Sequence, residues 1–386
     1  MKVAIIAPSE SLPLPSVKGG AIETLTTHLL NMNEKYRQCE FLVVSPYDKL
    51  AKETSEIYSH AKFSFHRQSF FTRLYRFISI CVSKVSFKLL RPKIPIVSQS
   101  YRILRKFNPD VIIVEGFCTQ VYQLTKLNKP IILHVHTDVL NIDVPYCQEI
   151  VLLCSKVWAI SEFIKKRIED GSNIHGKVEV LKNAIDISMF RKRNCEFLRT
   201  QLGIPANDKI AIFCGRVVPI KGVLEMLHAF KNSNQPDLSL VIVGGNNFAD
   251  SSLSEYEKLV FDYVKDNNLK VFFTGYQPQE KLSDFYSIAD FSICPSICNE
   301  AAGLVIIEAR CIGLPVIASN LGGIPEYVNP PSTILVNYDI NFEKSLSEAI
   351  DTLCDSSVLD VYKANAQEDL TDYSLDSYYN NFINLL

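Results

Sequence analysis

Residues 294–328, CPSICNEAAGLVIIEARCIGLPVIASNLGGIPEYV, contain the pattern that decides the fold. An apolar strand ends at Pro295, and a helix is predicted from about Gly303 to Gly313, where a second apolar strand follows. A buried strand, a helix and another buried strand in direct succession form a βα unit, which is the building block of parallel sheets.

The same alternation continues through the whole chain in two series. The first series of predicted strands comprises Lys2–Ala7, Phe41–Ser45, Val111–Glu115, Ile131–Val135, Lys156–Ile160 and Val178–Leu181. The second comprises Lys209–Cys214, Ser239–Gly244, Lys270–Thr274, Phe291–Cys294 and Pro315–Ala318. Two such series predict an α/β protein made of two Rossmann-like, doubly wound parallel-sheet domains.

The domain boundary is expected near residues 183–205, where the pattern is interrupted. We predict an N-terminal domain over residues 1–183 and a C-terminal domain over residues 184–371. A short amphipathic helix within residues 372–386 should pack back on the first domain. Because ligands of such folds bind beyond the carboxyl ends of the strands, the expected site is a cleft between two facing domains.

Composition is that of an ordinary globular protein, with a net charge of −2 over 386 residues. Several of the 11 cysteines lie inside apolar runs, which favours a reducing compartment. The close pair Cys294 and Cys298 has no second pair at zinc-site spacing, so no metal is predicted. No apolar run approaches the ~20 residues of a membrane span. We expect a cytoplasmic protein that is peripheral on the inner face of the plasma membrane.

Charge is unevenly distributed, because residues 57–109 hold eleven Lys and Arg residues and no acid. Within them, Ser69–Leu90 interleaves aromatic side chains with cations in an amphipathic helical pattern. Such a helix can bind an anionic membrane surface or a phosphorylated glycan. The plain alternative is a helix packed on the N-terminal domain with a solvated basic face. No nucleic-acid-binding motif accompanies the charge, so nucleic acid is not an expected partner.

Candidate binding residues surround the helix of the opening stretch. Glu300 falls in the loop before it. The N–H groups of Gly303, Leu304 and Val305 are unpaired at the helix start and suit an anion such as a diphosphate. Glu308, in the first turns, can accept hydrogen bonds from a vicinal diol such as ribose. The plain alternative is two solvated glutamates beside a core helix.

Two cations stand between a strand end and a helix start in CGRVVPIKG, residues 214–222. Arg216 closes the strand, and Lys221 precedes the helix. Cations in this position can neutralise a phosphate leaving group. Alternatively, both are solvated side chains.

Two further features follow strands of the first series. Gly19 and Gly20 would let backbone N–H groups approach a ligand, although the segment matches neither common phosphate-binding motif. Glu23, in the next helix, is expected to be solvated. His136, at the tip of a strand, would enter the cleft, whereas His134 is expected to be a structural histidine with satisfied hydrogen bonds.

Together these features resemble the glycosyltransferase family 4 enzymes, which have the GT-B arrangement of two facing Rossmann-like domains. The resemblance covers nearly the whole chain and is most specific in Glu300-x7-Glu308 followed by GLPVIASNLGGIPEYV. The segments GRVVPIKG, FTGYQPQEKLSDFYSIADFSICPS and VLKNAID support it. Within the family, the chain is most similar to lipopolysaccharide core N-acetylglucosaminyltransferases.

The resemblance implies a retaining, metal-independent enzyme. It would move a hexose or N-acetylhexosamine from a nucleotide sugar, expected to be UDP-linked, to a lipid-linked surface glycan such as lipopolysaccharide core. Arg216 and Lys221 would bind the donor diphosphate, and Glu308 would bind the ribose. Glu300 would hold the donor sugar. The remaining implied contacts are those of Tyr276 with the base, His136 with the transferred sugar, Gly19 and Gly20 with phosphate, and the amides of Gly303, Leu304 and Val305 with sugar and phosphate.

The catalytic set implied by the resemblance is His136, Glu300, Lys221 and Arg216. In a same-face attack the leaving diphosphate helps to deprotonate the acceptor, so no carboxylate pair of glycosidase type is required.

The chain departs from the family at two places. Ala302 stands where an aromatic residue is common, and Asn183-Ala184 replaces the usual Asn-Gly. Two alternatives stay open at this level: a nucleotide-sugar epimerase of similar fold, and an inactive sugar- or membrane-binding scaffold.

Overall fold

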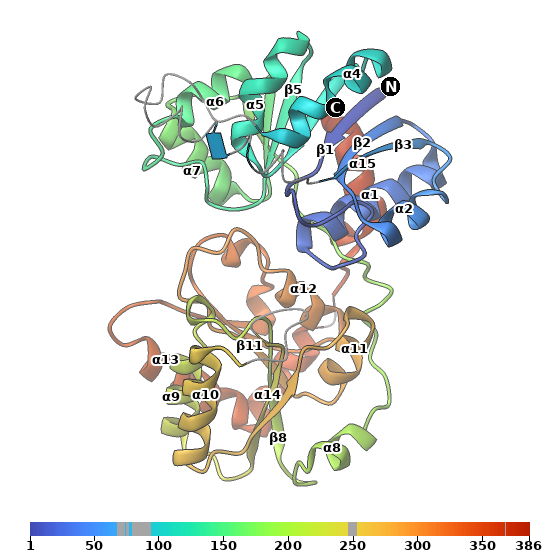
Figure 1. Cartoon of the computed structure of the whole chain (residues 1–386). Helices are drawn as coiled ribbons and strands as arrows, with labels where there is room; N and C mark the ends of the chain where they lie inside the picture. The colour runs from blue at the N-terminus through green and yellow to red at the C-terminus, as the bar shows by residue number, and fades with distance from the viewer. Residues whose placement is uncertain (68–73, 75–76, 79–93, 246–252, 367) are drawn as a thin grey trace. The chain divides into compact units, whose positions relative to one another are not determined.

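The computed structural model describes every residue except 68–73, 75, 76, 79–93, 246–252 and 367 (Figure 1). The chain divides into two units, Met1–Asn183 with Leu375–Leu386, and Ala184–Ser374. Each unit holds one sheet in which every pairing between described strands is parallel. The predicted fold class of two Rossmann-like, parallel-sheet domains is therefore confirmed.

The first unit contains a seven-stranded sheet in the order β3-β2-β1-β4-β5-β6-β7. Strand order reverses between β1 and β4, and such reversals place the loops of neighbouring strands on opposite sides of a crevice. The strands are β1 (Lys2–Ile6), β2 (Glu40–Pro46), β3 (Ala61–His66), β4 (Val111–Glu115), β5 (Ile131–Val135), β6 (Lys156–Ala159) and β7 (Val178–Val180). The helices are α1 (Ala21–Tyr36), α2 (Lys49–Ser55), α4 (Pro95–Phe107), η1 (Cys118–Gln120), α5 (Val121–Leu124), η2 (Thr125–Leu127), α6 (Cys147–Leu153) and α7 (Glu162–Ser172).

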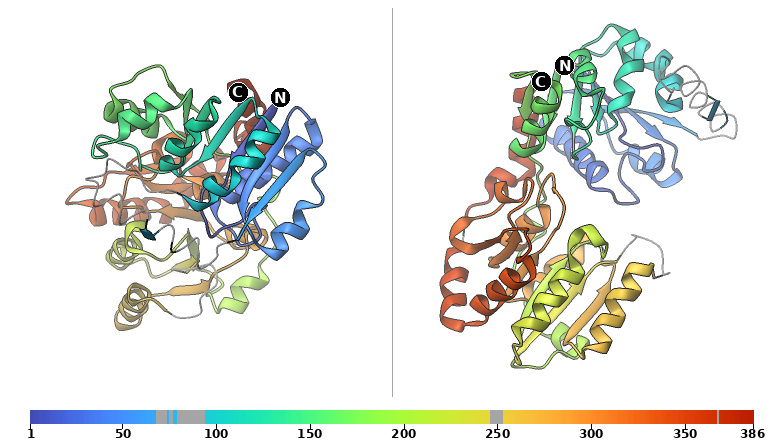
Figure 2. Two further views of the ribbon diagram at one scale, coloured as in Figure 1. Left: turned by 45° about the horizontal axis from the view of Figure 1, so that its top comes forward. Right: turned by 90° about the vertical axis from the view of Figure 1, so that its left-hand side faces the viewer.

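The last helix, α15 (Leu375–Leu385), completes the core of the first unit. The ring of Tyr379 stacks on Tyr36 of α1 with centroids 5.2 Å apart, and its hydroxyl donates to Asn33 Oδ1 at 2.8 Å. Phe382 packs edge-on against Trp158 of β6 at 5.4 Å. The two chain ends consequently lie side by side (Figures 1 and 2).

The second unit contains a six-stranded sheet in the order β10-β9-β8-β11-β12-β13. Its strands are β8 (Lys209–Cys214), β9 (Leu238–Val243), β10 (Val271–Gly275), β11 (Phe291–Cys294), β12 (Val316–Ser319) and β13 (Thr333–Val336). Its helices are α8 (Phe197–Leu202), η3 (Pro219–Lys221), α9 (Val223–Ser233), α10 (Glu255–Asp266), α11 (Gln279–Ser287), α12 (Leu304–Cys311), η4 (Ile324–Glu326), η5 (Pro330–Ser332), α13 (Phe342–Cys354), α14 (Ser356–Asn365) and η6 (Thr371–Tyr373).

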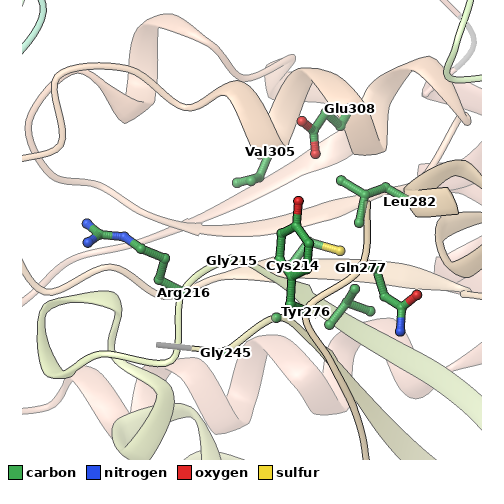
Figure 3. Close-up of a pocket in the computed structure, with 11 residues that line it drawn as sticks. Cys214, Gly215, Arg216, Gly245, Tyr276, Gln277, Leu282, Val305 and Glu308 are labelled. Atoms are coloured by element: carbon green, nitrogen blue, oxygen red, sulfur yellow. The ribbon is translucent and has the colours of Figure 1, made fainter. Parts of the chain in front are cut away.

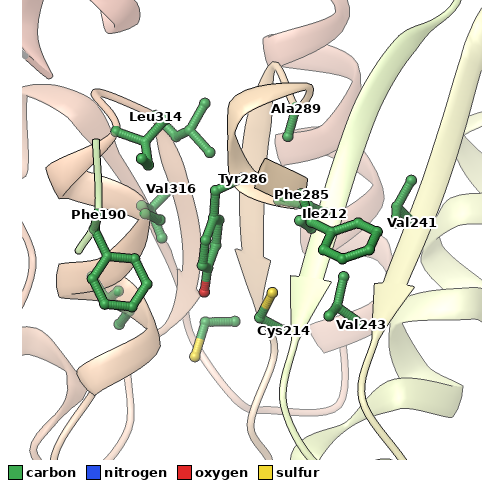
Figure 4. Packing of buried hydrophobic residues seen from close by; sticks show 14 of the residues in the cluster. Phe190, Ile212, Cys214, Val241, Val243, Phe285, Tyr286, Ala289, Leu314 and Val316 are labelled. Carbon is green, nitrogen blue, oxygen red and sulfur yellow. The ribbon is translucent and has the colours of Figure 1, made fainter. Parts of the chain in front are cut away.

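Separate apolar cores cover the two faces of this sheet. Helices α9, α10, α13 and α14 pack on one face, and α8, α11 and α12 pack on the other. In the second core Tyr286, which is fully buried, stands between Phe190 and Cys214 (Figure 4). Burial on both faces explains why the central strands are continuous apolar runs.

Two strands, β3 and β13, were not predicted from the sequence. Each lies at an edge of its sheet and is only partly buried. The sequence of β3 alternates apolar and polar residues, and the apolar run of β13 is only three residues long.

The basic segment Ser69–Leu90 lies outside the described residues apart from Leu74, Phe77 and Ile78, which are exposed. Among the described helices, none combines the length and apolar character that crossing a membrane requires.

Candidate functional site

A pocket opens at the carboxyl ends of β8, β9 and β10 in the second unit (Figure 3). Its lining includes Gly215 and Arg216 after β8, Gly244 and Gly245 after β9, Tyr276 after β10, and Val305 and Glu308 from α12. The strand ends approach so closely that a Cβ at Gly244 would lie 1.9 Å from the carbonyl oxygen of Gly215, and the φ of Gly244 is +134°. Glycine is therefore required there.

Glu308 is the buried acid of this pocket. Only 7 % of its surface is exposed, and the hydroxyl of Tyr286 donates to its Oε2 at 3.0 Å. Burial raises its pKa to about 7, although the hydrogen bond from Tyr286 opposes this shift. Tyr286 is the one hydrogen-bond donor to Glu308 among the described residues. The carboxylate therefore has lone pairs left for two hydroxyl groups of a ligand.

Replacing Glu308 by glutamine should change how stability depends on pH. The folded-state pKa of Glu308 lies above the ordinary value of 4.5, so the folded state holds its proton more tightly than the unfolded state does. The stability that this proton contributes is fully present below pH 4.5 and is lost as pH rises through about 7. Relative to the wild type, Glu308→Gln should gain up to about 3 kcal/mol of unfolding free energy between pH 4.5 and pH 8. Urea denaturation at both pH values measures this gain, with the exposed Glu255→Gln as control. Parallel pH curves for wild type and Glu308→Gln would contradict the burial of an ionisable group.

Lys221 and Glu300 are brought together although 79 positions separate them. The Lys221 ammonium forms an ion pair with Glu300 Oε1, and the hydroxyl of Ser296 donates to the same oxygen at 2.6 Å. A backbone hydrogen bond of 3.0 Å from the N–H of Ile297 to the carbonyl of Ile220 ties the two loops together. A positive and a negative group are thus held at the carboxyl ends of β8 and β11, where strand order reverses.

Three unpaired amides mark the start of α12. Gly303 is the N-cap residue and offers no side-chain cap. The N–H groups of Gly303, Leu304 and Val305 donate no hydrogen bond to any described residue. Unpaired amides at a helix N-terminus favour an anion.

Arg216 supplies an unpaired cation to the same pocket. Within the described part of the chain, its guanidinium makes no hydrogen bond or ion pair, and the residue is exposed. The structure thus places Arg216, Tyr276, Val305 and Glu308 on one pocket and joins Lys221 to Glu300 at the carboxyl ends of β8 and β11.

The other candidates, Gly19, Gly20 and His136, belong to the first unit. Gly19 and Gly20 have φ values of +78° and +104°, and Gly20 is the N-cap residue of α1. The prediction that Glu23 is solvated is wrong, because 4 % of its surface is exposed and burial raises its pKa. Its carboxylate folds back over Gly20, where a Cβ would lie 2.2 Å from Oε2.

His136 lies in a buried cluster that the sequence did not reveal. Its Nε2 is 2.8 Å from Glu115 Oε2, and His134 Nδ1 is 3.1 Å from the same oxygen. The expectation that His134 is fully satisfied is wrong, because its Nε2 is buried without a partner among the described residues. Glu115, His134 and His136 each offer one atom that could bind a metal, and these three atoms lie within 4.8 Å of one another. Among the described residues, this is the cluster that is compact enough to hold a metal ion.

Comparison with known protein families assigns both units. The model for glycosyltransferase family 4 matches residues 26–189, and the model for glycosyl transferases group 1 matches residues 194–371. The chain therefore belongs to the glycosyltransferases, with a family 4 domain followed by a group 1 domain.

The chain is also similar to individual proteins. The lipopolysaccharide 1,2-N-acetylglucosaminetransferase of Salmonella typhimurium is 32 % identical over 178 residues, which are 45 % of this chain and 46 % of the relative. Spore coat protein SA of Bacillus subtilis is 24 % identical over 92 % of this chain and 91 % of its own length. The crystal structure of Anabaena HepE with UDP has the same fold, with a TM-score of 0.72 at 19 % identity over 100 % of this chain and 99 % of HepE.

Proposed function

We propose that this glycosyltransferase is a retaining enzyme that uses a UDP-sugar, with a hexose or N-acetylhexosamine as the transferred group. The acceptor is a lipid-linked surface glycan, with lipopolysaccharide core as the first candidate. The observation that carries the proposal is the set of unpaired N–H groups at the start of α12. They lie at the edge of the sheet where the strands end, as do Arg216 and Lys221.

Each part of the donor has a matching group in the second unit. The diphosphate is bound by Arg216, Lys221 and the α12 amides, because these are cations and N–H donors. The ribose diol donates to the buried carboxylate of Glu308, and the base lies against the backbone at Tyr276. Glu300 holds the donor sugar and keeps Lys221 in place.

The reaction exchanges one bond to the anomeric carbon for another. The acceptor hydroxyl forms a bond to this carbon on the face from which the bond to the diphosphate oxygen breaks. The hydroxyl proton passes to the leaving diphosphate, whose growing negative charge is stabilised by Lys221 and Arg216. These cations supply the charge that a metal would otherwise supply, so we propose a metal-independent reaction.

Two properties of relatives support the choice of substrates. HepE was crystallised with UDP and with UDP-glucose, which makes UDP the first nucleotide to test. The Salmonella relative acts on lipopolysaccharide, which supports the acceptor class. In this proposal the first unit binds the acceptor, and the basic segment Ser69–Leu90 holds the protein on the inner face of the plasma membrane.

A donor screen tests the proposal. Purified protein is incubated with UDP-, GDP- and ADP-sugars, with and without lipid-linked glycan and with EDTA present, and nucleotide release is measured. Release of UDP that depends on the acceptor is the expected result. Conversion of one UDP-sugar into another without acceptor would indicate the epimerase alternative, and an absence of any turnover would indicate the scaffold.

A further inference from the structure

Glu115 forms a buried hydrogen-bonded cluster with two histidines in the first unit. Glu115 ends β4, and His134 and His136 lie on or directly after the neighbouring strand β5. One carboxylate oxygen, Oε2, is 2.8 Å from His136 Nε2 and 3.1 Å from His134 Nδ1. The exposed fractions of the side chains are 4 % for Glu115, 1 % for His134 and 5 % for His136.

Burying this cluster costs free energy. A contribution to the stability of the fold alone therefore does not explain why it is present. Removing an ionised carboxylate from water requires compensation by hydrogen bonds or charge. The compensation is incomplete at His134, whose Nε2 is buried without a partner among the described residues. The cluster lies at the carboxyl ends of strands next to the reversal of strand order, where ligands of such sheets bind.

The charge states follow from the surroundings of Glu115. Burial opposes its ionisation, but the two histidines outweigh this and lower its pKa to about 2. Burial and the proximity of His134 lower the pKa of His136 to about 4, although Glu115 opposes this. Glu23 of α1 and Tyr378 of α15 also face Glu115. At neutral pH, Glu115 is therefore an anion and His136 is uncharged.

An uncharged imidazole carries one proton, and an ionised carboxylate only accepts hydrogen bonds. Nε2 of His136 must therefore hold the proton that it donates to Glu115. Its other ring nitrogen, Nδ1, makes no hydrogen bond to any described residue and keeps its lone pair. The hydrogen bond at one nitrogen thus decides what the other nitrogen can do.

We propose that Glu115 is a positioning residue, which fixes His136 with its proton on Nε2 so that Nδ1 accepts a hydrogen bond from a hydroxyl group of the acceptor glycan, which the proposed function assigns to the first unit. The proposal rests on the proposed function, since it supplies the ligand that Nδ1 meets. Hydrogen bonds of 2.8 and 3.1 Å account for the spacing of the three groups without a metal between them.

The tautomers can be measured directly in the wild-type protein. Long-range proton–nitrogen NMR correlations of protein labelled with ¹⁵N in histidine distinguish protonated from unprotonated ring nitrogens. At pH 7 we expect His136 to be protonated at Nε2 and His134 to be protonated at Nδ1, with assignment by single His→Asn variants. A proton on Nδ1 of His136 would overturn the proposal, and this readout does not require activity.

The variant Glu115→Gln tests the consequence for turnover. Its amide both donates and accepts, so it no longer dictates the tautomer, and kcat should fall about 10- to 100-fold. The KM for the UDP-sugar should stay within about threefold, because the donor is bound by the second unit. Glu179→Gln, on β7 of the same sheet, is the matched control and should keep wild-type kcat.

The outcomes separate this proposal from the proposed function. If the wild type consumes no nucleotide sugar, the proposed function fails, whereas the NMR result still decides the role of Glu115. If Glu115→Gln keeps both wild-type kcat and wild-type His136 signals, Glu115 is not a positioning residue. Stoichiometric binding of Zn²⁺ that is lost in Glu115→Gln would also overturn the proposal, because both histidines would then need lone pairs toward Glu115.

Discussion

Replacing Lys221 by alanine should lower kcat for sugar transfer by about 10²- to 10³-fold. The diphosphate gains negative charge as its bond to the sugar breaks, and in the proposed function the Lys221 ammonium stabilises this charge. Steady-state UDP release at saturating donor measures the loss. Lys231→Ala, which removes an exposed lysine from α9 of the same unit, is the matched control and should keep wild-type activity.

The ion pair with Glu300 requires a second variant. In Lys221→Ala the carboxylate of Glu300 retains the hydrogen bond from Ser296 but loses its cation. The double variant Lys221→Ala/Glu300→Gln removes that uncompensated charge. If the double variant recovers full turnover, Lys221 serves only to neutralise Glu300, and its assignment to the diphosphate is wrong.

Replacing Glu308 by alanine should weaken UDP binding about 10- to 100-fold, which corresponds to about 1.4–2.8 kcal/mol. In the proposed function the ribose hydroxyls donate hydrogen bonds to the carboxyl group of Glu308, and these bonds are lost in the variant. Titration calorimetry with UDP measures the change, and Glu255→Ala is the control because this carboxylate is exposed.

A ligand variant makes the Glu308 test more specific. The wild type should bind UDP more tightly than 2′-deoxy-UDP, and Glu308→Ala should bind the two about equally, since the partner of the missing hydroxyl is gone. An undiminished preference for UDP in Glu308→Ala would show that another group recognises the ribose.

The fold could be predicted because its central strands are buried on both faces. A strand such as β8 must then be apolar throughout, and this produces a run that is visible in the sequence. The same reasoning fails at the sheet edges, where the half-exposed strand β3 alternates polar and apolar side chains.

The candidate site was predictable only where its residues lie close together in sequence. Glu300, Gly303 and Glu308 share one strand–helix connection, so the sequence predicts that they lie near one another, although their spacing alone left open that both glutamates are only solvated. Lys221 was found in the same way, but its ion pair with Glu300 depends on tertiary structure.

Glu115 and Glu23 show the opposite case. Each is a single acid in an ordinary strand or helix, and nothing in the local sequence indicates burial. The contact of Glu115 with His136 and the burial of Glu23 become evident only when the strands and helices are packed together.

The most direct test of the account compares UDP with UMP by titration calorimetry, in the wild type and in Lys221→Ala. If the cations and the α12 amides hold a diphosphate, the wild type should bind UDP at least about tenfold more tightly than UMP, a difference of about 1.4 kcal/mol. In Lys221→Ala this difference should shrink to within about threefold. Equal affinity of the wild type for UDP and UMP, or no binding of UDP, would contradict the account.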